Sequence, residues 1–295
     1  MHINNVTWCN TYKVSQRVAS RFSHEGRVFI AGDACHTHSP NAGQGANVSM
    51  VDAYNLAWKI AYVVNGWSGS SILDTYEQER RPYSLELIEF DKEIEKLFHP
   101  EGLSPEEYAQ LWHRHLMFTT QGVGVQYRSS LTVLADSPDV KTSVQIGERL
   151  PPSDFVCYID WNPCNIHDIL RYNMQFKLVV FAGDIAQDAV KRRFCDFIAA
   201  LHEMAPPKPS LDIYAVIDTK KEELNAEYYV WMREYIPEAQ IFIDDGIMAT
   251  GIHGVSVMSS GSGAAVLVRP DGHVVMIIPV SRDNVHRVRD YLSSL

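Results

Sequence analysis

One stretch of sequence decides the fold: residues 32–47 read Gly32-Asp33-Ala34-Cys35-His36-Thr37-His38-Ser39-Pro40-Asn41-Ala42-Gly43-Gln44-Gly45-Ala46-Asn47. The β-branched and aromatic run from Arg27 to Gly32 predicts a short buried strand that ends at a Gly-Asp pair. A polar loop follows. We then expect a helix from near Gly43–Gly45 to about Asn65, because Gly66 is a natural C-cap. The stretch therefore predicts a strand, a loop and a helix in immediate succession.

The residue types at this predicted junction are those of a ligand-binding site. A Gly-Asp pair at the end of a strand places the Asp33 carboxylate where it can accept hydrogen bonds from the hydroxyls of a polyol. The helix N-terminus offers unpaired N–H groups and a partial positive charge of roughly half a unit. Small residues at Ala42, Gly43, Gly45 and Ala46 let a flat ligand lie against the backbone, and the site suits an anion such as a reduced isoalloxazine. An ordinary strand-loop-helix junction would need only one or two of these glycines.

Two long helical patterns follow the loop. The first, over about 43–65, predicts one broad buried apolar face. The second, over about 70–98, contains Pro82, which should kink it or split it in two. A third helical stretch is expected over Ser104–Thr132. The first pattern rests on Ala46, Met50, Val51, Tyr54, Ala57, Trp58, Ala61 and Val64, and the second on Leu73, Tyr76, Arg80, Leu87, Phe90, Ile94 and Leu97.

Beyond about residue 145, strands and helices alternate. An Asp-Gly pair in the run 269–272, between two apolar segments, predicts a hairpin because its turn needs positive φ. The order β-α-β-(α)-β-β-α, with a parallel start and an antiparallel end, is that of a thioredoxin-like fold. The expected strands are Phe176–Ala182, Leu211–Ile217, Gln240–Ile243, Gly263–Val268 and His273–Ile278, and the expected helices are Ile185–Met204 and Asp283–Leu292.

Composition narrows the classes of protein. The 295 residues suffice for two domains, and 46% hydrophobic and 21% charged residues are typical of a globular chain. A net charge of -10 without a basic run argues against nucleic-acid binding. No apolar stretch reaches the roughly 20 residues that span a bilayer, and the first residues show no signal peptide. Five irregularly spaced cysteines fit a reducing compartment, so we expect a cytoplasmic protein that binds neither nucleic acid nor membrane.

Residues 32–47 resemble a family motif. The run Gly-Asp-Ala-x-His-x-x-Ser-Pro-x-Ala-Gly-Gln-Gly-x-Asn is similar to the second flavin fingerprint of the class A flavoprotein monooxygenases. Similarity to that class, and to its phenol hydroxylase branch, covers roughly residues 6–98 and resumes more weakly in the C-terminal part. Besides the motif, the residues that carry this similarity are Gln16–Ala19, Phe22–Phe29, His38, Asp52–Asn55, Tyr54–Lys59 and Thr75–Pro82.

The resemblance implies the C-terminal piece of a class A flavin monooxygenase FAD domain, followed by a thioredoxin-like α/β domain. Asp33 would hydrogen-bond the FAD ribityl chain, Pro40 would lie beside the isoalloxazine, and the amides of Gly45, Ala46 and Asn47 would face its pyrimidine edge. The implied activity is that of an FAD-dependent phenol hydroxylase-like monooxygenase, which hydroxylates a small phenolic substrate with NADPH and O2. The implied assembly is a homodimer formed through the C-terminal domain.

The expected organisation is a partial FAD-binding domain over 1–105, a helical linker region over 106–145 and a thioredoxin-like dimerisation domain over 146–295. Family members also carry a Gly-x-Gly-x-x-Gly turn for the ADP half of FAD and a middle sheet domain that supplies the catalytic residues. The nearest approach to that turn is Gly122-Val123-Gly124, so the catalytic residues stay unknown. We therefore expect a chain truncated at its N-terminus. It would be a fragment, half of a split enzyme, or a redox-silent relative. That relative would act as a cofactor-independent cyclase, isomerase or dehydratase, or as a partner subunit of a full-length hydroxylase.

Cysteines and histidines suggest two weaker hypotheses. Cys35, His36 and His38 could indicate a metal site, but we expect them to brace the loop, and no metal is predicted. The run Trp161-Asn162-Pro163-Cys164 lacks the first cysteine of a Cys-x-x-Cys motif. Because Cys157 lies too far upstream for that motif, disulfide exchange is not expected.

Charged residues gather within the second predicted helix. Glu77, Glu79, Arg80 and Arg81 are expected to form solvent and interdomain ion pairs, and Arg80 is expected to help hold the cofactor domain. His253 and Gly254 are interpreted as part of a turn rather than as catalytic residues.

Overall fold

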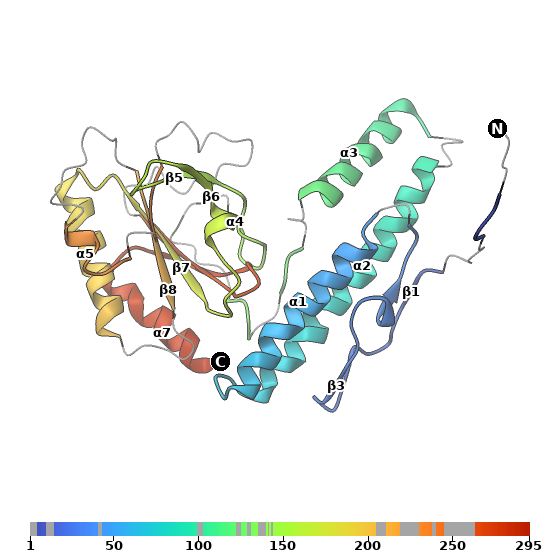
Figure 1. Cartoon of the computed structure of the whole chain (residues 1–295), viewed down its shortest axis with the longest axis horizontal. Helices are drawn as coiled ribbons and strands as arrows, with labels where there is room; N and C mark the ends of the chain where they lie inside the picture. The colour runs from blue at the N-terminus through green and yellow to red at the C-terminus, as the bar shows by residue number, and fades with distance from the viewer. Residues whose placement is uncertain are drawn as a thin grey trace. The chain divides into compact units, whose positions relative to one another are not determined.

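The computed structural model describes residues 5–9, 15–40, 43–98, 103–121, 125–128, 131–134, 140, 142, 144–204, 211–218, 230–237, 240–244 and 263–295. The chain forms two compact units, and Figure 1 colours it from blue at the N-terminus to red at the C-terminus. Unit 1 comprises Met1–Ala53 and Arg80–Gly122, and unit 2 comprises Tyr54–Glu79 and Val123–Leu295. Asn41, Ala42, Gly122–Gly124 and His253–Gly254 lie outside the described residues.

Unit 1 contains two short antiparallel strand pairs. These are β1 (Arg17–Val18) with β4 (His36–Thr37), and β2 (Ser23–His24) with β3 (Val28–Phe29). The strand predicted over 27–32 is thus only two residues long. Its burial was predicted wrongly, because Val28 is 58% exposed. A two-stranded hairpin has two faces, and Val28 lies on the one that meets solvent.

Three helices follow these strands. α1 spans Gly45–Val64 and ends as predicted, with Gly66 at a φ of +66°. After a 3-10 turn over Ser70–Leu73, α2 spans Asp74–Phe98 and continues through Pro82, so of the two predicted outcomes, a kink or a split, the split does not occur. α3 spans Pro105–Gln121, and its predicted extension to Thr132 is wrong because Thr132 lies in a turn.

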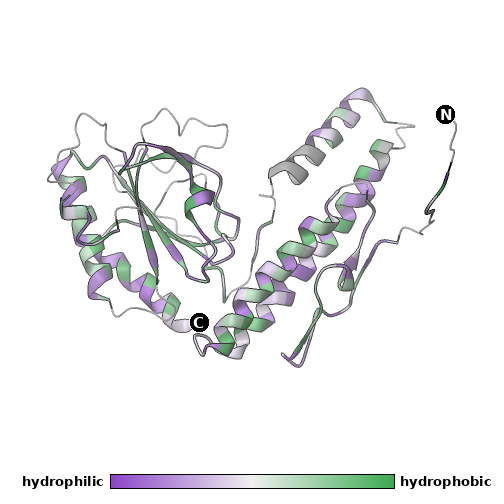
Figure 2. Ribbon diagram, in the orientation of Figure 1, coloured by the Kyte–Doolittle hydropathy of each residue, from purple (hydrophilic) through white to green (hydrophobic). Residues whose placement is uncertain are grey.

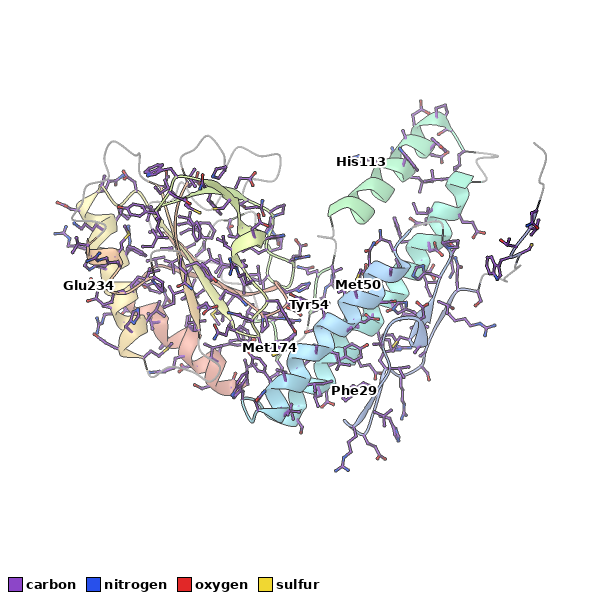
Figure 3. All side chains as sticks on the ribbon, viewed as in Figure 1. Phe29, Met50, Tyr54, His113, Met174 and Glu234 are labelled. Atoms are coloured by element: carbon purple, nitrogen blue, oxygen red, sulfur yellow. The ribbon has the colours of Figure 1, made fainter. Side chains whose placement is uncertain are left out.

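The buried face of α1 is not the predicted one. Met50 (Figure 3) is 61% exposed and Val64 79% exposed, and Trp58 is the one fully buried member of the eight predicted positions. The helix instead buries the polar side chains of Asp52 and Lys59. Their burial is possible because each is paired with a charged side chain of α2. All seven positions predicted for the second helix are buried, six of them on α2 and Leu73 in the 3-10 turn before it.

Unit 2 is organised around one seven-stranded mixed sheet, in the order β11-β10-β7-β8-β9-β5-β6. β7, β8 and β9 are parallel to one another, and the remaining pairs are antiparallel. The strands are β5 (Asp154–Cys157), β6 (Pro163–Asn165), β7 (Lys177–Gly183), β8 (Asp212–Ile217), β9 (Ile241–Ile243), β10 (Ala264–Val268) and β11 (Val274–Pro279).

Helices cover this sheet. α4 (Ile166–Ile169) is a single turn after β6, and α5 (Asp188–Glu203) connects β7 to the parallel β8. α7 (Val285–Ser294) lies beside α5 in Figure 1. The order β11-β10-β7-β8 with these two helices confirms the predicted thioredoxin-like arrangement. The β5–β6 hairpin was not predicted, because its strands are short and lack an apolar pattern.

The core of unit 2 lies between the sheet and its helices. Every residue of β10 is buried, and strands β7, β8 and β11 are nearly so. Figure 2 shows the corresponding hydrophobic colouring along the strands and the mixed colouring of α5. The predicted Asp-Gly turn joins β10 to β11, with Gly272 at a φ of +85°. Within the described part of the chain, no helix is long and apolar enough to cross a membrane.

Candidate functional site

The loop after β3 approaches α1 closely. It begins with a 3-10 turn over Gly32–Ala34, and Gly32 has a φ of +62°. A Cβ atom at Gly32 would lie 2.8 Å from Oγ of Ser49 on α1. Both the backbone conformation and the contact with α1 therefore require glycine here.

Exposure along this loop separates two sets of residues. The six residues predicted to bind a cofactor are all accessible, with Gly45 partly exposed and the other five exposed. Five other residues of the same run are buried, whereas Ala34 and Thr37 are also exposed. The accessible set is Asp33, Pro40, Gly43, Gly45, Ala46 and Asn47, and the buried set is Gly32, Cys35, His36, Ser39 and Gln44. Their role in cofactor binding stays a prediction.

Asp52 on α1 holds the first half of the loop. Its Oδ2 accepts hydrogen bonds from the backbone N–H of Gly32 at 3.0 Å and from Nε2 of His36 at 2.9 Å. Its Oδ1 accepts from Nε of Arg80 at 2.6 Å, and the side chains of this His36–Asp52–Arg80 group are fully buried. Burial opposes ionisation, but His36 and Arg80 outweigh it and hold the pKa of Asp52 below its usual value.

Asp91 on α2 holds the second half of the loop. It accepts hydrogen bonds from the backbone N–H of Ser39 at 2.7 Å, from Oγ of Ser39 at 2.6 Å and from Nε2 of Gln16 at 2.9 Å. The residue immediately before Pro40 is therefore fixed in position. Sequence reasoning missed both Asp52 and Asp91. The signal available was a carboxylate at helical spacing among apolar positions.

The residues weighed as metal ligands have other partners. His36 is bound to Asp52, and Nδ1 of His38 donates to the carbonyl of Ser39 at 2.9 Å. The two imidazole rings stack with their centroids 6.0 Å apart. In the described ranges, no group of three His, Cys, Asp or Glu side chains could hold a metal ion.

The exposed side of the loop carries a negative carboxylate and borders the partly positive N-terminus of a helix. Asp33 has one weak contact, a hydrogen bond from Oγ of Ser49 to Oδ1 at 3.3 Å, and is otherwise open to solvent. Gly45, Ala46 and Asn47 are the first three residues of α1, so their N–H groups have no acceptor within the helix. A carboxylate and the positive end of a 20-residue helix thus border the same loop.

A second buried charge cluster lies in unit 2. Nζ of Lys59 donates to Glu79 at 2.7 Å, and Arg269 bonds Glu79 at 2.7 Å and Asp271 at 2.5 Å. The indole N–H of Trp58 donates to Asp271 at 3.1 Å. Glu79 is 3% exposed, so the prediction that it forms solvent ion pairs is wrong. Arg80 is also fully buried, which contradicts that prediction for it as well.

Burial and pairing act in opposite directions in this cluster. Burial lowers the pKa of Lys59 to about 8, although the charge of Glu79 partly restores it. Burial would raise the pKa of Glu79, but the charges of Arg269 and Lys59 outweigh it and hold that pKa well below its usual value. Two cations therefore meet two carboxylates, since Asp271 is also ionised through Arg269.

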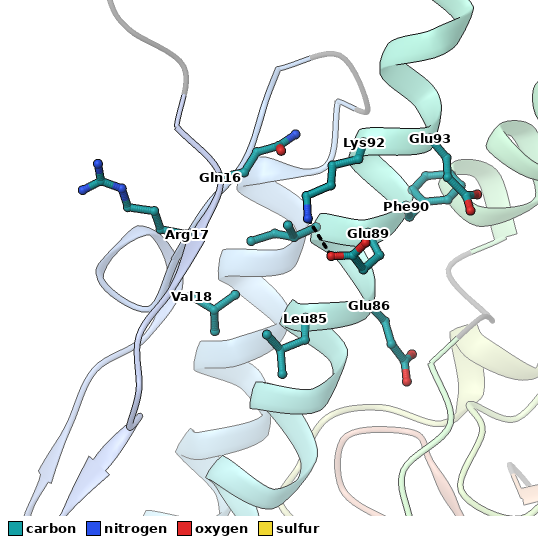
Figure 4. Close-up of a pocket in the computed structure, with 10 residues that line it drawn as sticks. Gln16, Arg17, Val18, Leu85, Glu86, Glu89, Phe90, Lys92 and Glu93 are labelled. Atoms are coloured by element: carbon teal, nitrogen blue, oxygen red, sulfur yellow. Dashed lines mark hydrogen bonds and ion pairs between the residues drawn. The ribbon is translucent and has the colours of Figure 1, made fainter.

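A groove of about 590 Å³ opens in unit 1 between β1 and α2. Val18, Leu85 and Ile88 contribute apolar surface, and the ion pair of Glu89 and Lys92 (2.6 Å) lies at its side (Figure 4). None of the predicted cofactor-binding residues lines it.

Two family models match the chain. That of the FAD binding domain covers residues 3–91, and that of the phenol hydroxylase C-terminal dimerisation domain covers residues 125–295. The phenol 2-monooxygenase fsqG of Aspergillus fumigatus is 33% identical over an alignment of 304 positions, which covers 98% of this chain and 51% of that protein. The 3-hydroxybenzoate 4-monooxygenase of Comamonas testosteroni is 29% identical over 95% of this chain and 50% of its own length. The chain thus spans about half the length of these curated relatives.

Solved structures show the same fold. CabE, an aromatic hydroxylase from angucycline biosynthesis, matches with a TM-score of 0.57 and 25% identity over 96% of this chain and 47% of its own. Aklavinone-11 hydroxylase, solved with FAD and aklavinone, matches with a TM-score of 0.59 and 24% identity over 96% of this chain and 46% of its own. Since the dimerisation-domain model covers more than half of the chain, the chain belongs to the phenol hydroxylase-like branch of the FAD-dependent aromatic monooxygenases.

Proposed function

We propose that this chain forms the flavin-edge and dimerisation parts of an FAD-dependent, phenol hydroxylase-like monooxygenase. The reaction would hydroxylate the ring of a small phenolic substrate with NADPH and O2. One observation carries the proposal: the residues predicted to meet the flavin are accessible, while Gly32, His36 and Ser39 of the same loop are buried and bonded to Asp52 or Asp91. The match to an FAD binding domain over residues 3–91 supports the same cofactor.

The residues present fit a flavin. The open Asp33 carboxylate would accept hydrogen bonds from ribityl hydroxyls, and the N–H groups of Gly45, Ala46 and Asn47 would meet the pyrimidine edge, where reduction places negative charge. A Cβ atom at Gly43 would meet nothing within 4 Å, so the backbone there is open to a flat ring. Bound FAD would supply the electron transfer and oxygen chemistry.

The protein groups behind the loop would keep this surface rigid. Asp52 is held ionised between His36 and Arg80, so its Oδ2 remains an acceptor for the Gly32 N–H. Asp91 fixes Ser39, so that Pro40 would stay beside the ring and exclude water from one side. Preorganised groups of this kind cost no rearrangement when charge develops on the ring.

Flavin binding by the chain is the direct test. We expect riboflavin and FAD to bind with similar affinity, because the assigned contacts reach only the ribityl chain and the ring. Asp33→Ala should weaken binding about tenfold, since a hydrogen bond to a charged group contributes about 1.5 kcal/mol. The exposed Asp290, on α7, provides the control variant Asp290→Ala. Fluorescence titration of the flavin measures both.

Two outcomes separate the alternatives. Flavin uptake that Asp33→Ala weakens, followed by NADPH oxidation that a phenol accelerates, supports the monooxygenase. A chain that binds no flavin at any concentration tested contradicts the proposed site and favours the redox-silent cyclase, isomerase or dehydratase, or the partner subunit.

Assembly is a separate part of the proposal. We propose that the chain forms a homodimer through residues 146–295, which fall within the match to the dimerisation domain. Light scattering of the purified chain should give twice the mass of 33.4 kDa. A monomeric mass at tens of micromolar protein would contradict the proposed dimer.

A further inference from the structure

Two cysteines lie side by side in the β5–β6 hairpin at one edge of the sheet of unit 2. Phe155 on β5 pairs with Cys164 on β6, and the N–H of Cys157 donates to the carbonyl of Asn162 at 2.9 Å. Because alternate residues of a strand share a face, Cys157 and Cys164 point to the same side as diagonal neighbours. Antiparallel pairing thus brings together two thiols that are seven positions apart in the sequence.

Cys157 lies close enough to influence the ionisation of Cys164. Sγ of Cys164 also lies 3.5 Å from the carbonyl oxygen of Phe155. Both side chains are half-buried against the same hydrophobic core, and both cysteines are free thiols. Burial, with a smaller contribution from Cys157, raises the pKa of Cys164 to about 12.

We propose that Cys157 and Cys164 form a reversible intramolecular disulfide when the protein meets a hydroperoxide such as hydrogen peroxide. In the first step, the Cys157 thiolate attacks the peroxide, an S–O bond forms and hydroxide leaves, which takes up the thiol proton to become water. In the second step, Cys164 sulfur attacks the Cys157 sulfenic acid, the S–S bond forms and a second water leaves. Two thiols are oxidised and one peroxide is reduced.

The roles of the two thiols follow from their surroundings. A thiol must ionise to attack a peroxide, so the raised pKa of Cys164 makes it the second, resolving group. The spacing of seven residues does not match the Cys-x-x-Cys motif, so the sequence alone did not predict the pair. It becomes visible once the strand register is known.

The hairpin allows the small movement that the bond requires. Diagonal neighbours in an antiparallel pair are about 7–8 Å apart at Cα, whereas a disulfide needs about 4.4–6.8 Å. β6 is a three-residue strand that ends the sheet order and, in the part of the chain that the structure describes, pairs only with β5, so it can move toward β5. A bond formed under such tension is easily reduced, which makes the oxidation reversible.

Thiol counting and peptide mapping test the proposal. The native chain is exposed to a small excess of hydrogen peroxide, alkylated, and cleaved by a protease that cuts before aspartate. Such a protease opens the chain at Asp160, between the two cysteines, so a disulfide would hold two peptides together. We expect that linked pair, the loss of two of the five free thiols and full recovery with dithiothreitol.

Variants separate this pair from ordinary oxidation. Cys157→Ser and Cys164→Ser should each abolish the linked peptides. The matched control Cys195→Ser, at a half-buried cysteine on α5, should leave them unchanged. With Cys164→Ser, Cys157 should stop at the sulfenic acid and react with dimedone. The proposal is overturned if Cys157 is oxidised without cross-linking in the native chain, or if the linked peptides contain Cys9 or Cys195.

Discussion

Units 1 and 2 each bury an arginine against carboxylates, but they use it differently. In unit 2, Arg269 donates to Glu79, Asp271 and Thr132, and its guanidinium lies 5.3 Å from the Trp58 ring centroid and 5.0 Å from that of Tyr127. In unit 1, Nε of Arg80 donates to Asp52, whose other oxygen accepts from the Gly32 amide. One cluster thus binds side chains to one another, whereas the other binds a backbone loop.

This difference shows which cluster serves the candidate site. The unit 2 cluster joins α1 and α2 residues to the β10–β11 turn and neutralises its own charges, so its effect is structural. The unit 1 cluster fixes the backbone on which Asp33 is carried, so its effect reaches the exposed surface. Neighbouring residues of α2, Glu79 and Arg80, supply one member to each cluster.

Removing the arginine of unit 2 should have the largest effect. Arg269→Met leaves Glu79 and Asp271 ionised and buried without their main partner, which costs about 5 kcal/mol of the free energy of unfolding. The control Arg282→Met removes an exposed ion pair with Glu203 and should cost no more than about 1 kcal/mol. Urea unfolding measures both. Equal costs for the two variants would show that the Arg269 cluster does not hold unit 2 together.

Removing the carboxylate of unit 1 should cost less but reach the loop. Asp52→Ala leaves Arg80 buried without its carboxylate and frees the Gly32 N–H, at a cost of about 3 kcal/mol. Amide hydrogen exchange over residues 32–39 should rise, while that of β10 and β11 stays unchanged. Asp33→Ala, at an exposed position, should keep stability within about 0.5 kcal/mol. An equal rise in amide exchange for Asp33→Ala and Asp52→Ala would contradict these assignments, in which Asp52 supports the loop and Asp33 contacts the ligand.

The sequence predicted the strands of unit 2 and the buried positions of α2 well. The strands β7 to β11 and the buried positions of α2 follow from runs and spacing of apolar side chains, which need no knowledge of their partners. The face of α1 was predicted wrongly because apolar periodicity cannot show that Asp52 and Lys59 meet Arg80 and Glu79. Pairing between side chains distant in sequence decides burial there.

The loop shows the same limit. Its glycines and Asp33 were predicted to bind a ligand, and the family resemblance implied the role of each. The carboxylates that hold the loop, Asp52 and Asp91, were missed because they are distant in sequence and do not touch the proposed ligand. The diagonal cysteine pair was missed for a related reason, since strand register is set by the sheet and not by local spacing.

Lowering the pH should reduce the contribution of the unit 2 cluster to the free energy of unfolding. The pKa of Glu79 is lower in the folded chain than its usual value of 4.5. Its contribution is therefore complete above about pH 5 and is lost as pH falls through the folded value. The stability difference between wild type and Glu79→Gln should shrink below pH 4.5, by at most about 1.4 kcal/mol per pH unit. Urea unfolding from pH 7 to pH 3 measures this difference. Glu203→Gln, at an exposed position, is the control. If the difference in the free energy of unfolding between wild type and Glu79→Gln stayed constant with pH, the assigned ion pairs of Glu79 would be contradicted.

The smallest effect tests how closely the loop lies on α1. Gly32→Ala and Gly26→Ala both place a Cβ on a backbone with φ near +60°, which costs about 1 kcal/mol in each case. The Cβ at Gly26 meets open space, whereas the one at Gly32 lies 2.8 Å from Oγ of Ser49, which adds about 1 kcal/mol of overpacking.

The second change Ser49→Gly in the Gly32→Ala background removes that contact. We expect it to cost less there than in the wild-type chain, as thermal unfolding would report. A double variant whose two costs simply add would mean that Ser49 yields to the new methyl group, and that the loop is held on α1 by its hydrogen bond to Asp52 rather than by its packing against Ser49.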